Sequence, residues 1–252
     1  MPSSTRAVSA PTGSTLTAPR LLVARRTPDG LITPIGVLDQ LTGGYSFAYL
    51  RQVLDVPAFR PLLGFEDLER RYVSTELFPL FSQRLMDPRR TDYQWYLTVL
   101  GLSEGASPMV VLGRSEGRRA GDAITLVAEP EVDASGRTSA SFFVHGLRHR
   151  AGAEPRVATL RKGEQLALRD DLQNPVNPRA LLVTRNAEEL GWIPDLLLDY
   201  VHRVRETGEM TIRVAQVNGA DTPPNLRLRV QLEGCTPEGY LPFHGEDWAT
   251  TA

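Results

Sequence analysis

Hydrophobic residues between positions 20 and 50 occur in short runs that are separated by turn-forming residues. In residues 45–49 aromatic side chains alternate with small ones, which is typical of a strand with one buried face. The Gly43-Gly44 pair directly before this run is a hairpin signal. We therefore expect a small antiparallel meander with strands at residues 21–24, 32–38 and 45–49.

Between residues 64 and 100 the hydrophobic spacing becomes that of a helix. Four residues share one face of the helix predicted over residues 77–86: Leu77, Phe78, Phe81 and Leu85. Pro79 fits the first turn of this helix if the cap is one of the residues just before it, namely Ser74, Thr75 or Glu76. A second helix is predicted over residues 92–100, and a short third one begins at Ser107-Pro108.

The polar stretch 129–140 interrupts this pattern and predicts a domain boundary or a long hairpin. Beyond it the hydrophobic period is mostly two, which predicts strands at residues 141–144, 165–169, 180–184, 190–193, 212–217 and 226–233. Pro194 begins a helix, at the first-turn position where proline is tolerated. The buried face of this helix is formed by Leu197, Tyr200, Val201 and Val204, and Gly208 ends it. The second half is therefore expected to be a small β-barrel with one covering helix.

These elements together predict an α+β protein with two folded parts. Residues 19–130 form a small sheet with helices, and residues 141–235 form the barrel. Residues 1–18 are rich in Ser, Thr, Ala and Pro and predict a disordered tail. Residues 236–252 are expected to be a C-terminal tail.

Composition excludes several classes of protein. Among 252 residues there is one cysteine, Cys235, so a secreted domain held by internal disulfides is excluded. The four histidines and this cysteine form no C-x-x-C or H-E-x-x-H pattern, so we expect no metal site. No hydrophobic run approaches the roughly 20 residues that cross a bilayer, and no signal-peptide pattern occurs. We expect a soluble, cytoplasmic protein.

Charge is nearly balanced over the whole chain, with 28 Lys and Arg against 30 Asp and Glu and a net charge of −2. That balance argues against a wholly basic nucleic-acid binder but leaves room for a local basic surface. Residues 142–169 carry a local net charge of +4, and residues 170–199 carry −4. The only lysine, Lys162, lies in the basic segment. This segment is either a phosphate-binding strip or an ordinary solvated surface.

Four stretches in the second half resemble the HIRAN domain in order and spacing. They are residues 143–149 (FVHGLRH), 160–168 (LRKGEQLAL), 174–183 (NPVNPRALLV) and 190–194 (LGWIP). The resemblance implies a modified OB-type barrel that binds single-stranded DNA, notably its 3′ end, and that performs no chemistry of its own. Free-standing members of the family occur in bacteria, and this chain is similar to that type.

The family's binding cleft pairs a Gly-Leu-Arg-aromatic stretch with an Asn-Pro-aromatic-Asp stretch. Carried over residue by residue, the resemblance implies that Arg148 and Asn174 line the cleft and that His149 stacks on a base. Val176 replaces the family's aromatic residue, which removes a stacking surface worth about 1–3 kcal/mol per base. Asn177 replaces the acidic residue, so its amide oxygen would accept from a terminal hydroxyl without charge assistance. Arg161 and Lys162 complete the expected binding residues.

The first half resembles, over a short stretch, the N-terminal subdomain of HipA-type proteins. The similarity rests on residues 34–38, 45–49 and 77–81. The kinase body of that family is absent, since no G-x-x-x-x-G-K-[ST] loop and no H-R-D stretch occurs. The glycine-rich loop 113–122, with three arginines, is either a phosphate cradle or an exposed connector.

These observations predict a non-catalytic protein without cofactor that binds nucleic acid, specifically single-stranded DNA, through the HIRAN-like barrel. The alternative is a protein-interaction adaptor whose DNA cleft is degenerate, which is favoured by Val176 and Asn177. A hydrolase with an unrecognised site has no support in the residues, since no G-x-S-x-G elbow or Cys–His pair indicates a nucleophile.

Overall fold

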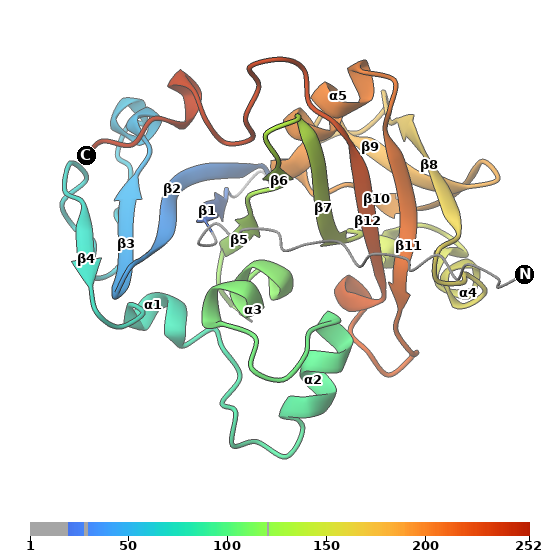
Figure 1. The fold of residues 1–252 in the computed structure, drawn as a ribbon, viewed down its shortest axis with the longest axis horizontal. Coiled ribbons are helices and arrows are strands. Elements are labelled where there is room, and N and C mark those ends of the chain that lie inside the picture. The colour runs from blue at the N-terminus through green and yellow to red at the C-terminus, as the bar shows by residue number, and fades with distance from the viewer. Residues whose placement is uncertain (1–19, 28–29, 120) are drawn as a thin grey trace, which may run out of the picture.

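The computed structural model describes residues 20–27, 30–119 and 121–252, and the tail predicted over residues 1–18 lies outside the described residues. It contains two antiparallel sheets and a few short helices, so the predicted α+β class is confirmed (Figure 1). The helices α1, α2 and α3 lie along one side of the molecule, below the sheets in the view of Figure 1.

The first sheet has the strand order β4-β3-β2-β1-β5. Its strands are β1 (Arg20–Arg26), β2 (Ile32–Leu41), β3 (Gly44–Tyr49), β4 (Tyr72–Ser74) and β5 (Ile124–Ala128). The predicted meander is confirmed, because β1, β2 and β3 pair in sequence as antiparallel neighbours. One face of this sheet packs against an aromatic cluster around Phe47, Phe65 and Phe81.

Helix α1 (Pro79–Ser82) is much shorter than the helix predicted over residues 77–86. The predicted caps are also wrong, because Phe78 is the N-cap and no side chain caps the helix. Ser74 instead ends strand β4, and its hydroxyl accepts a hydrogen bond from the Glu76 N–H at 3.1 Å. Leu77 and Leu85 still pack against the aromatic cluster. The helix-like spacing of hydrophobic residues in 77–86 therefore reflects the burial of a mostly irregular segment.

Helices α2 (Tyr93–Leu100) and α3 (Pro108–Ser115) confirm the other two predicted helices. Ser107 caps α3 by accepting from the Val110 N–H, and α2 ends at Gly101, whose φ of 65° favours glycine. The two helices pack on each other and on Phe143 of the second sheet. They therefore connect the two halves of the chain.

The second sheet has the strand order β10-β9-β8-β11-β12-β7-β6. Its strands are β6 (Glu131–Val132), β7 (Arg137–Phe143), β8 (Gln165–Asp170), β9 (Leu181–Arg185), β10 (Glu188–Trp192), β11 (Thr211–Val217) and β12 (Leu228–Cys235). The polar stretch 129–140 forms the hairpin between β6 and β7. Helix α4 (Ala153–Ala158) lies between β7 and β8 in the chain.

The predicted barrel is not closed by continuous strand pairing over the described residues. The sheet curls, and its two ends meet at a single bridge in which His145 and Trp192 exchange two backbone hydrogen bonds of 2.9 Å. We call this bridge the seam. A register shift between Glu189 and Gly191 bends β10 just before the seam. Gly191 permits this close approach, because a Cβ atom there would overlap the carbonyl oxygen of His145.

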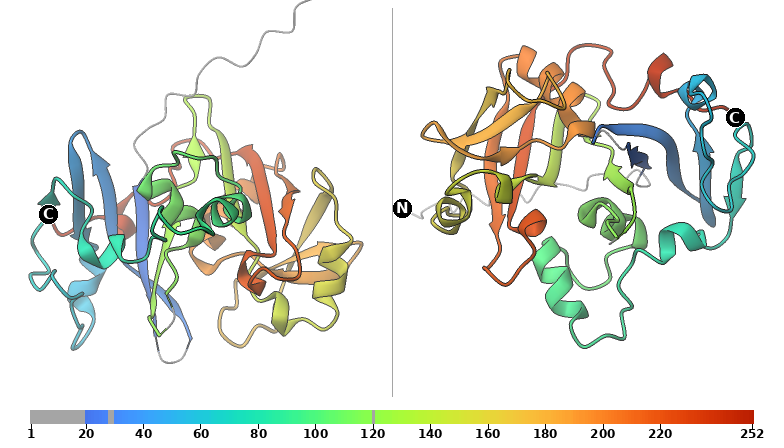
Figure 2. Two further views of the ribbon diagram at one scale, coloured as in Figure 1. Left: turned by 90° about the horizontal axis from the view of Figure 1, so that it is seen from below. Right: turned by 180° about the vertical axis from the view of Figure 1, so that it is seen from behind.

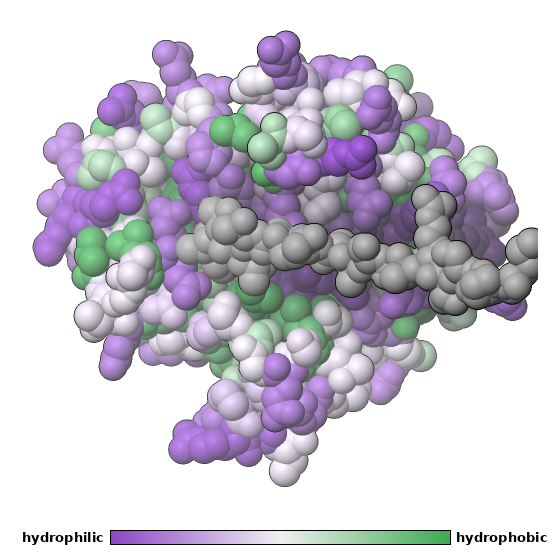
Figure 3. All heavy atoms as spheres, in the orientation of Figure 1, coloured by the Kyte–Doolittle hydropathy of each residue, from purple (hydrophilic) through white to green (hydrophobic). Residues whose placement is uncertain are grey.

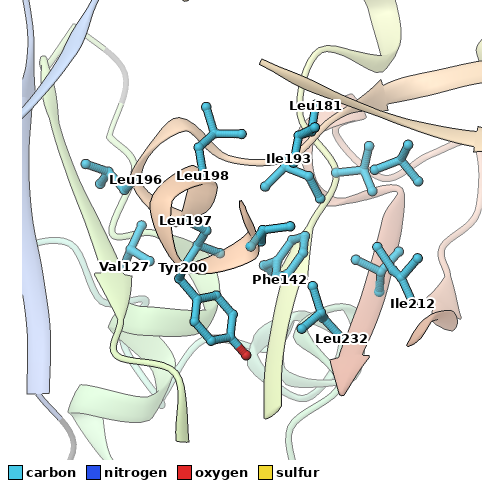
Figure 4. Packing of buried hydrophobic residues seen from close by; sticks show 14 of the residues in the cluster. Val127, Phe142, Leu181, Ile193, Leu196, Leu197, Leu198, Tyr200, Ile212 and Leu232 are labelled. Carbon is cyan, nitrogen blue, oxygen red and sulfur yellow. The ribbon is translucent and has the colours of Figure 1, made fainter. Parts of the chain in front are cut away.

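Helix α5 (Leu198–Glu206) confirms the predicted covering helix, with Tyr200, Val201 and Val204 buried. It begins later than predicted, because Asp195–Leu197 after Pro194 form a 3-10 turn. Tyr200 is buried, and its hydroxyl lies 2.9 Å from that of Thr138 on β7. Figure 4 shows Tyr200 beside Phe142 and Leu232, with Val127 of the first sheet on the other side of the helical segment. One hydrophobic core is therefore shared by both sheets.

Residues 236–252 run from β12 back to the first sheet (Figures 1 and 2). Phe243 is buried in the shared core and contacts Trp248 with a ring-centroid distance of 5.0 Å. Thr250 then forms a bridge with Leu50 at the end of β3. The domain limits predicted from the sequence stay a prediction.

The face of the molecule seen in Figure 3 is mostly polar. Hydrophilic residues cover most of the face seen in Figure 3, with smaller hydrophobic areas between them. Within the described ranges, no helix has the length and apolar character needed to cross a bilayer. The compartment predicted from the sequence stays a prediction.

Candidate nucleic-acid interface

A groove with a volume of about 430 Å³ lies where strand β8 ends and its following loop begins. Residues 170–175 line the groove together with Arg150, Arg169 and Glu189. Of the residues that the resemblance assigns to a binding cleft, Asn174 lines this groove, whereas Arg148, His149 and Asn177 are not among its lining residues.

Trp192 and its partners form the rigid part of this site. The guanidinium of Arg150 lies over the Trp192 ring, 4.0 Å from the centroid, and the indole N–H donates to Asp171 Oδ2 at 2.8 Å. Arg150 also pairs with Asp171 at 3.2 Å and with Glu189 at 2.9 Å. Arg150, Asp171, Glu189 and Trp192 were not among the predicted site residues, although Trp192 is part of the LGWIP motif.

Asn174 and Asn177 use their amides to hold the loop together. The Asn174 Oδ1 accepts from the N–H groups of Val176 and Asn177, both at 3.0 Å, and its Nδ2 donates to Asp171 at 3.2 Å. The Asn177 Oδ1 accepts from the Arg179 N–H at 3.0 Å. Both amides thus shape the loop, as asparagine commonly does in turns. Their predicted role as ligands stays a prediction.

The Asn177 Nδ2 donates to Asp195 Oδ1 at 3.3 Å, so both ends of this amide have protein partners. The structure therefore presents no uncommitted acid or amide at this position for a terminal hydroxyl.

Arg148 and His149 are exposed and directly precede Arg150, which lines the groove. They belong to a 3-10 turn over Leu147–His149, and the Arg148 Nε donates to His149 Nε2 at 3.0 Å. The turn begins at Gly146, whose φ is 70° and whose missing side chain leaves room for the Trp192 ring. Among the described residues no carboxylate pairs with Arg148. Its guanidinium is therefore free to bind an anion.

The fold does not bring Arg161 and Lys162 to the groove. They lie in the turn before β8, whereas the groove follows the other end of that strand. A six-residue strand at about 3.3 Å per residue separates the two positions by roughly 20 Å. Both side chains are exposed, and no ion pair involves either one within the described part of the chain. The predicted site residues thus fall into two groups.

The basic and acidic segments seen in the sequence largely neutralise each other in the fold. Arg150, Arg156 and Arg169 all pair with carboxylates on β10 or beside it. In the acidic segment, Arg185 pairs with Glu164 and Arg179 with Asp199. Of the six basic residues between positions 142 and 169, those without a carboxylate partner among the described residues are Arg148, Arg161 and Lys162.

Two hydrophobic side chains stand exposed on the loop of the groove. Leu172 is 84% exposed and Val176 is 45% exposed. Val176 occupies the position where the resemblance places an aromatic residue. Exposed apolar groups beside a groove can contact the faces of bases or the side chains of a partner protein.

In the glycine-rich segment 113–122, Arg118 and Arg119 both bind protein groups. Arg118 pairs with Glu116 at 2.6 Å, and Arg119 donates to the Gln83 side chain at 3.3 Å. Glu116 is buried and also accepts from His145 Nε2 at 2.5 Å, next to the seam. Burial alone would raise the pKa of Glu116, but the charges and hydrogen bonds of His145 and Arg118 lower it to about 2.

We expect the substitution Glu116→Gln to remove part of the pH dependence of stability. Because the pKa in the folded state lies below the ordinary value of 4.5, the carboxylate stabilises the fold above that pH and loses this effect as the pH falls towards 2. At about 1.4 kcal/mol per pKa unit, the free energy of unfolding should fall by roughly 3 kcal/mol at neutral pH. Urea unfolding at several pH values measures this difference.

The difference in the free energy of unfolding between the wild type and Glu116→Gln should become smaller as the pH falls towards 3. Glu154→Gln, on the exposed side of α4, is the matched control and should change the free energy of unfolding by less than about 0.5 kcal/mol. A constant offset between the Glu116→Gln and wild-type curves at all pH values would contradict the assignment.

The chain is only distantly similar to known proteins. No protein-family model matches it, and no curated protein matches it. Of the solved structures, the HIRAN domain of human HLTF is similar over 42% of this chain and 84% of its own, with 20% identity and a TM-score of 0.31. A protein from Lactobacillus plantarum is similar over 40% of this chain and 100% of its own, with 18% identity and a TM-score of 0.32. The resemblance of the first half to HipA-type proteins stays a prediction.

Proposed function

We propose that this protein binds single-stranded DNA at the exposed edge of the groove and performs no reaction on it. The observation that carries the proposal is the Arg148–His149 turn, which is exposed and has no carboxylate partner in the described part of the chain. A free guanidinium beside an imidazole ring combines a phosphate ligand with a surface on which a base can stack.

The surrounding contacts support this arrangement. Gly146 lies against the Trp192 ring at the start of the turn, and the guanidinium of Arg150 lies over the same ring. The exposed side chain of Leu172 offers an apolar surface at the groove. Such a site would bind a strand through its backbone and base faces and would discriminate little between sequences.

Recognition of a 3′ end is not part of the proposal. The amides of Asn174 and Asn177 already have protein partners, so a terminal hydroxyl would compete with the hydrogen bonds that shape the loop. Nucleotides inside a DNA strand have no terminal 3′ hydroxyl, so binding them would not compete with these hydrogen bonds.

Fluorescence anisotropy of a labelled thymidine oligonucleotide, at about 50 mM and about 200 mM salt, tests the proposal. We expect the affinity to fall with salt, and Arg148→Ala to reduce the slope of log K against log salt by about 0.7, the value for one contact to a single strand. Absence of binding at low salt would contradict the proposal. Binding that is unchanged when Arg148→Ala is combined with Lys162→Ala would contradict it too.

A protein-interaction adaptor is the second candidate. It is favoured by the pairing of Arg150, Arg156 and Arg169 with carboxylates, which leaves few free cations for phosphates. Affinity capture from lysate with and without nuclease separates the two functions. Partners that survive nuclease and are lost with Leu172→Asp would support the adaptor, whereas partners that disappear with nuclease support nucleic-acid binding.

A further inference from the structure

Two arginines from different halves of the chain meet between helix α3 and the second sheet. Residues alternate along β7 and β12, so that Phe142 and Val230 enter the shared core. Ser141 and Arg229 point to the opposite face, where Arg114 of α3 approaches them. The Ser141 hydroxyl lies 3.2 Å from Arg114 Nη1 and 2.9 Å from Arg229 Nη1.

The hydrogen-bond donors in this cluster outnumber the acceptors. Both guanidinium groups share the single oxygen of Ser141, and this hydroxyl donates in turn to the Val230 carbonyl at 3.2 Å. Arg229 Nη2 donates to Gln216 Oε1 at 3.0 Å. The Nε of Arg229 is buried and has no hydrogen-bond partner, which is costly for a charged group.

The positive charges of the cluster are also uncompensated. Among the described residues, no carboxylate forms an ion pair with Arg114 or Arg229. Burial and the nearby charge of Arg229 lower the pKa of Arg114 to about 10, and the carboxylate of Glu131 opposes this only in part. Burial lowers the pKa of Arg229 as well. Two half-buried cations side by side destabilise each other unless an anion joins them.

The surroundings hold Arg229 in place. A Cβ atom at Gly101 would overlap its guanidinium, so glycine at the end of α2 leaves the space that the side chain occupies. Gln216 accepts from Arg229 and donates to the Thr98 carbonyl at 2.7 Å, near the end of α2. The side chain is therefore positioned before any ligand arrives, which reduces the entropy lost on binding.

We propose that Arg114 and Arg229, together with Ser141, form a binding site for a phosphate-type oxyanion between α3 and the β7–β12 face. The planar donor forks of two guanidinium groups match the oxygen atoms of a phosphate group, and Ser141 holds the two groups next to each other by accepting from both. The phosphate group belongs either to a small phosphorylated compound or to the backbone of a nucleic acid. This site is separate from the Arg148–His149 turn and does not depend on the proposed function.

Thermal unfolding of the full chain, in inorganic phosphate and in chloride at matched ionic strength, tests the site. We expect phosphate to raise the Tm of the wild type above its value in chloride, because a ligand that binds only the folded state stabilises it. Arg229→Gln and Arg114→Gln should each weaken phosphate binding at least tenfold. Arg137→Gln, an exposed arginine on the same strand as Ser141, is the matched control and should leave binding unchanged.

The Tm in chloride shows whether the variants fold. Since each substitution removes one of two mutually repelling charges, we expect a Tm in chloride equal to or above that of the wild type. Arg114→Lys keeps the charge but loses the donor fork, and should bind phosphate more weakly while remaining folded. The proposal is overturned if phosphate and chloride give the same wild-type Tm, or if phosphate stabilises all variants equally.

Binding of a labelled oligonucleotide to the same variants identifies the source of the phosphate group. If Arg229→Gln weakens phosphate binding and leaves the oligonucleotide affinity unchanged, the ligand is a small phosphorylated compound. If both affinities fall together, the ligand is the nucleic-acid backbone. Failure of the wild type to bind any oligonucleotide would remove the proposed function while leaving the phosphate titration to decide this site.

Discussion

Replacing Arg148 and His149 together with alanine is expected to lower the affinity for a single-stranded oligonucleotide by roughly 30-fold or more. The loss combines a stacking surface worth about 1–3 kcal/mol per base with one charge-assisted contact to a phosphate. Both side chains are exposed and contact chiefly each other, so the free energy of unfolding should change by less than about 0.5 kcal/mol. Fluorescence anisotropy measures the affinity, and urea unfolding measures the stability.

The matched control is the pair Arg161→Ala and Lys162→Ala at the opposite end of β8. These residues are also exposed and have no ion pair within the described ranges, and the double substitution removes two positive charges, against one for the Arg148 and His149 pair with His neutral. We expect it to weaken binding by less than about fivefold, through general electrostatics alone. If this control loses as much affinity as the Arg148 and His149 double variant, the bound strand does not lie at the groove.

The substitution Gly191→Ala is expected to have the largest effect on stability. The new Cβ atom would overlap the carbonyl oxygen of His145, which is backbone and cannot rotate away. The two hydrogen bonds of the seam between His145 and Trp192 would then lengthen or break. Overpacking and the loss of these bonds together should lower the free energy of unfolding by about 3 kcal/mol or more.

Binding should weaken in the same variant, because the seam positions Trp192 and thereby the turn that begins at Gly146. Gly163→Ala is the control for backbone strain alone, since its φ is 85° and a Cβ atom there meets nothing within 4 Å. The substitution Gly163→Ala should lower the free energy of unfolding by about 1 kcal/mol. Equal destabilisation by both substitutions, measured by urea unfolding, would show that the seam adds nothing to the stability of the sheet.

Strands were predictable from the sequence where one face is buried. The alternation in residues 226–233 corresponds to β12, whose Leu228, Val230 and Leu232 are fully buried. Residues 77–86 show the limit of the same reasoning. Their hydrophobic spacing reports burial against the aromatic cluster, and an irregular chain with one short helix achieves that burial equally well.

The site was predictable only where its residues are neighbours in the chain. Arg148 and His149 lie in one motif and form one turn in the structure. The contact of Arg150 with Trp192 and Asp171 joins three separate segments, and it depends on the seam and on the bend in β10. No spacing in the sequence indicates such a contact.

Asn174 and Asn177 show why residue type alone does not fix the role of a side chain. An asparagine offers the same acceptor to a ligand and to a backbone N–H group. The sequence contains no information on which backbone groups in the loop lack partners, and here those groups bind both side chains. The charge of residues 142–169 was misleading for a similar reason, because its partners lie on other strands.

Hydrogen–deuterium exchange with and without a saturating oligonucleotide tests most directly where the strand binds. We predict slower exchange at residues 146–150 and 171–177, which form the exposed turn and the loop of the groove. Residues 161–164, in the turn at the other end of β8, should exchange at the same rate in both samples. Protection that spares both of the first two segments, while binding is demonstrated, would contradict the assignment of the groove as the nucleic-acid interface.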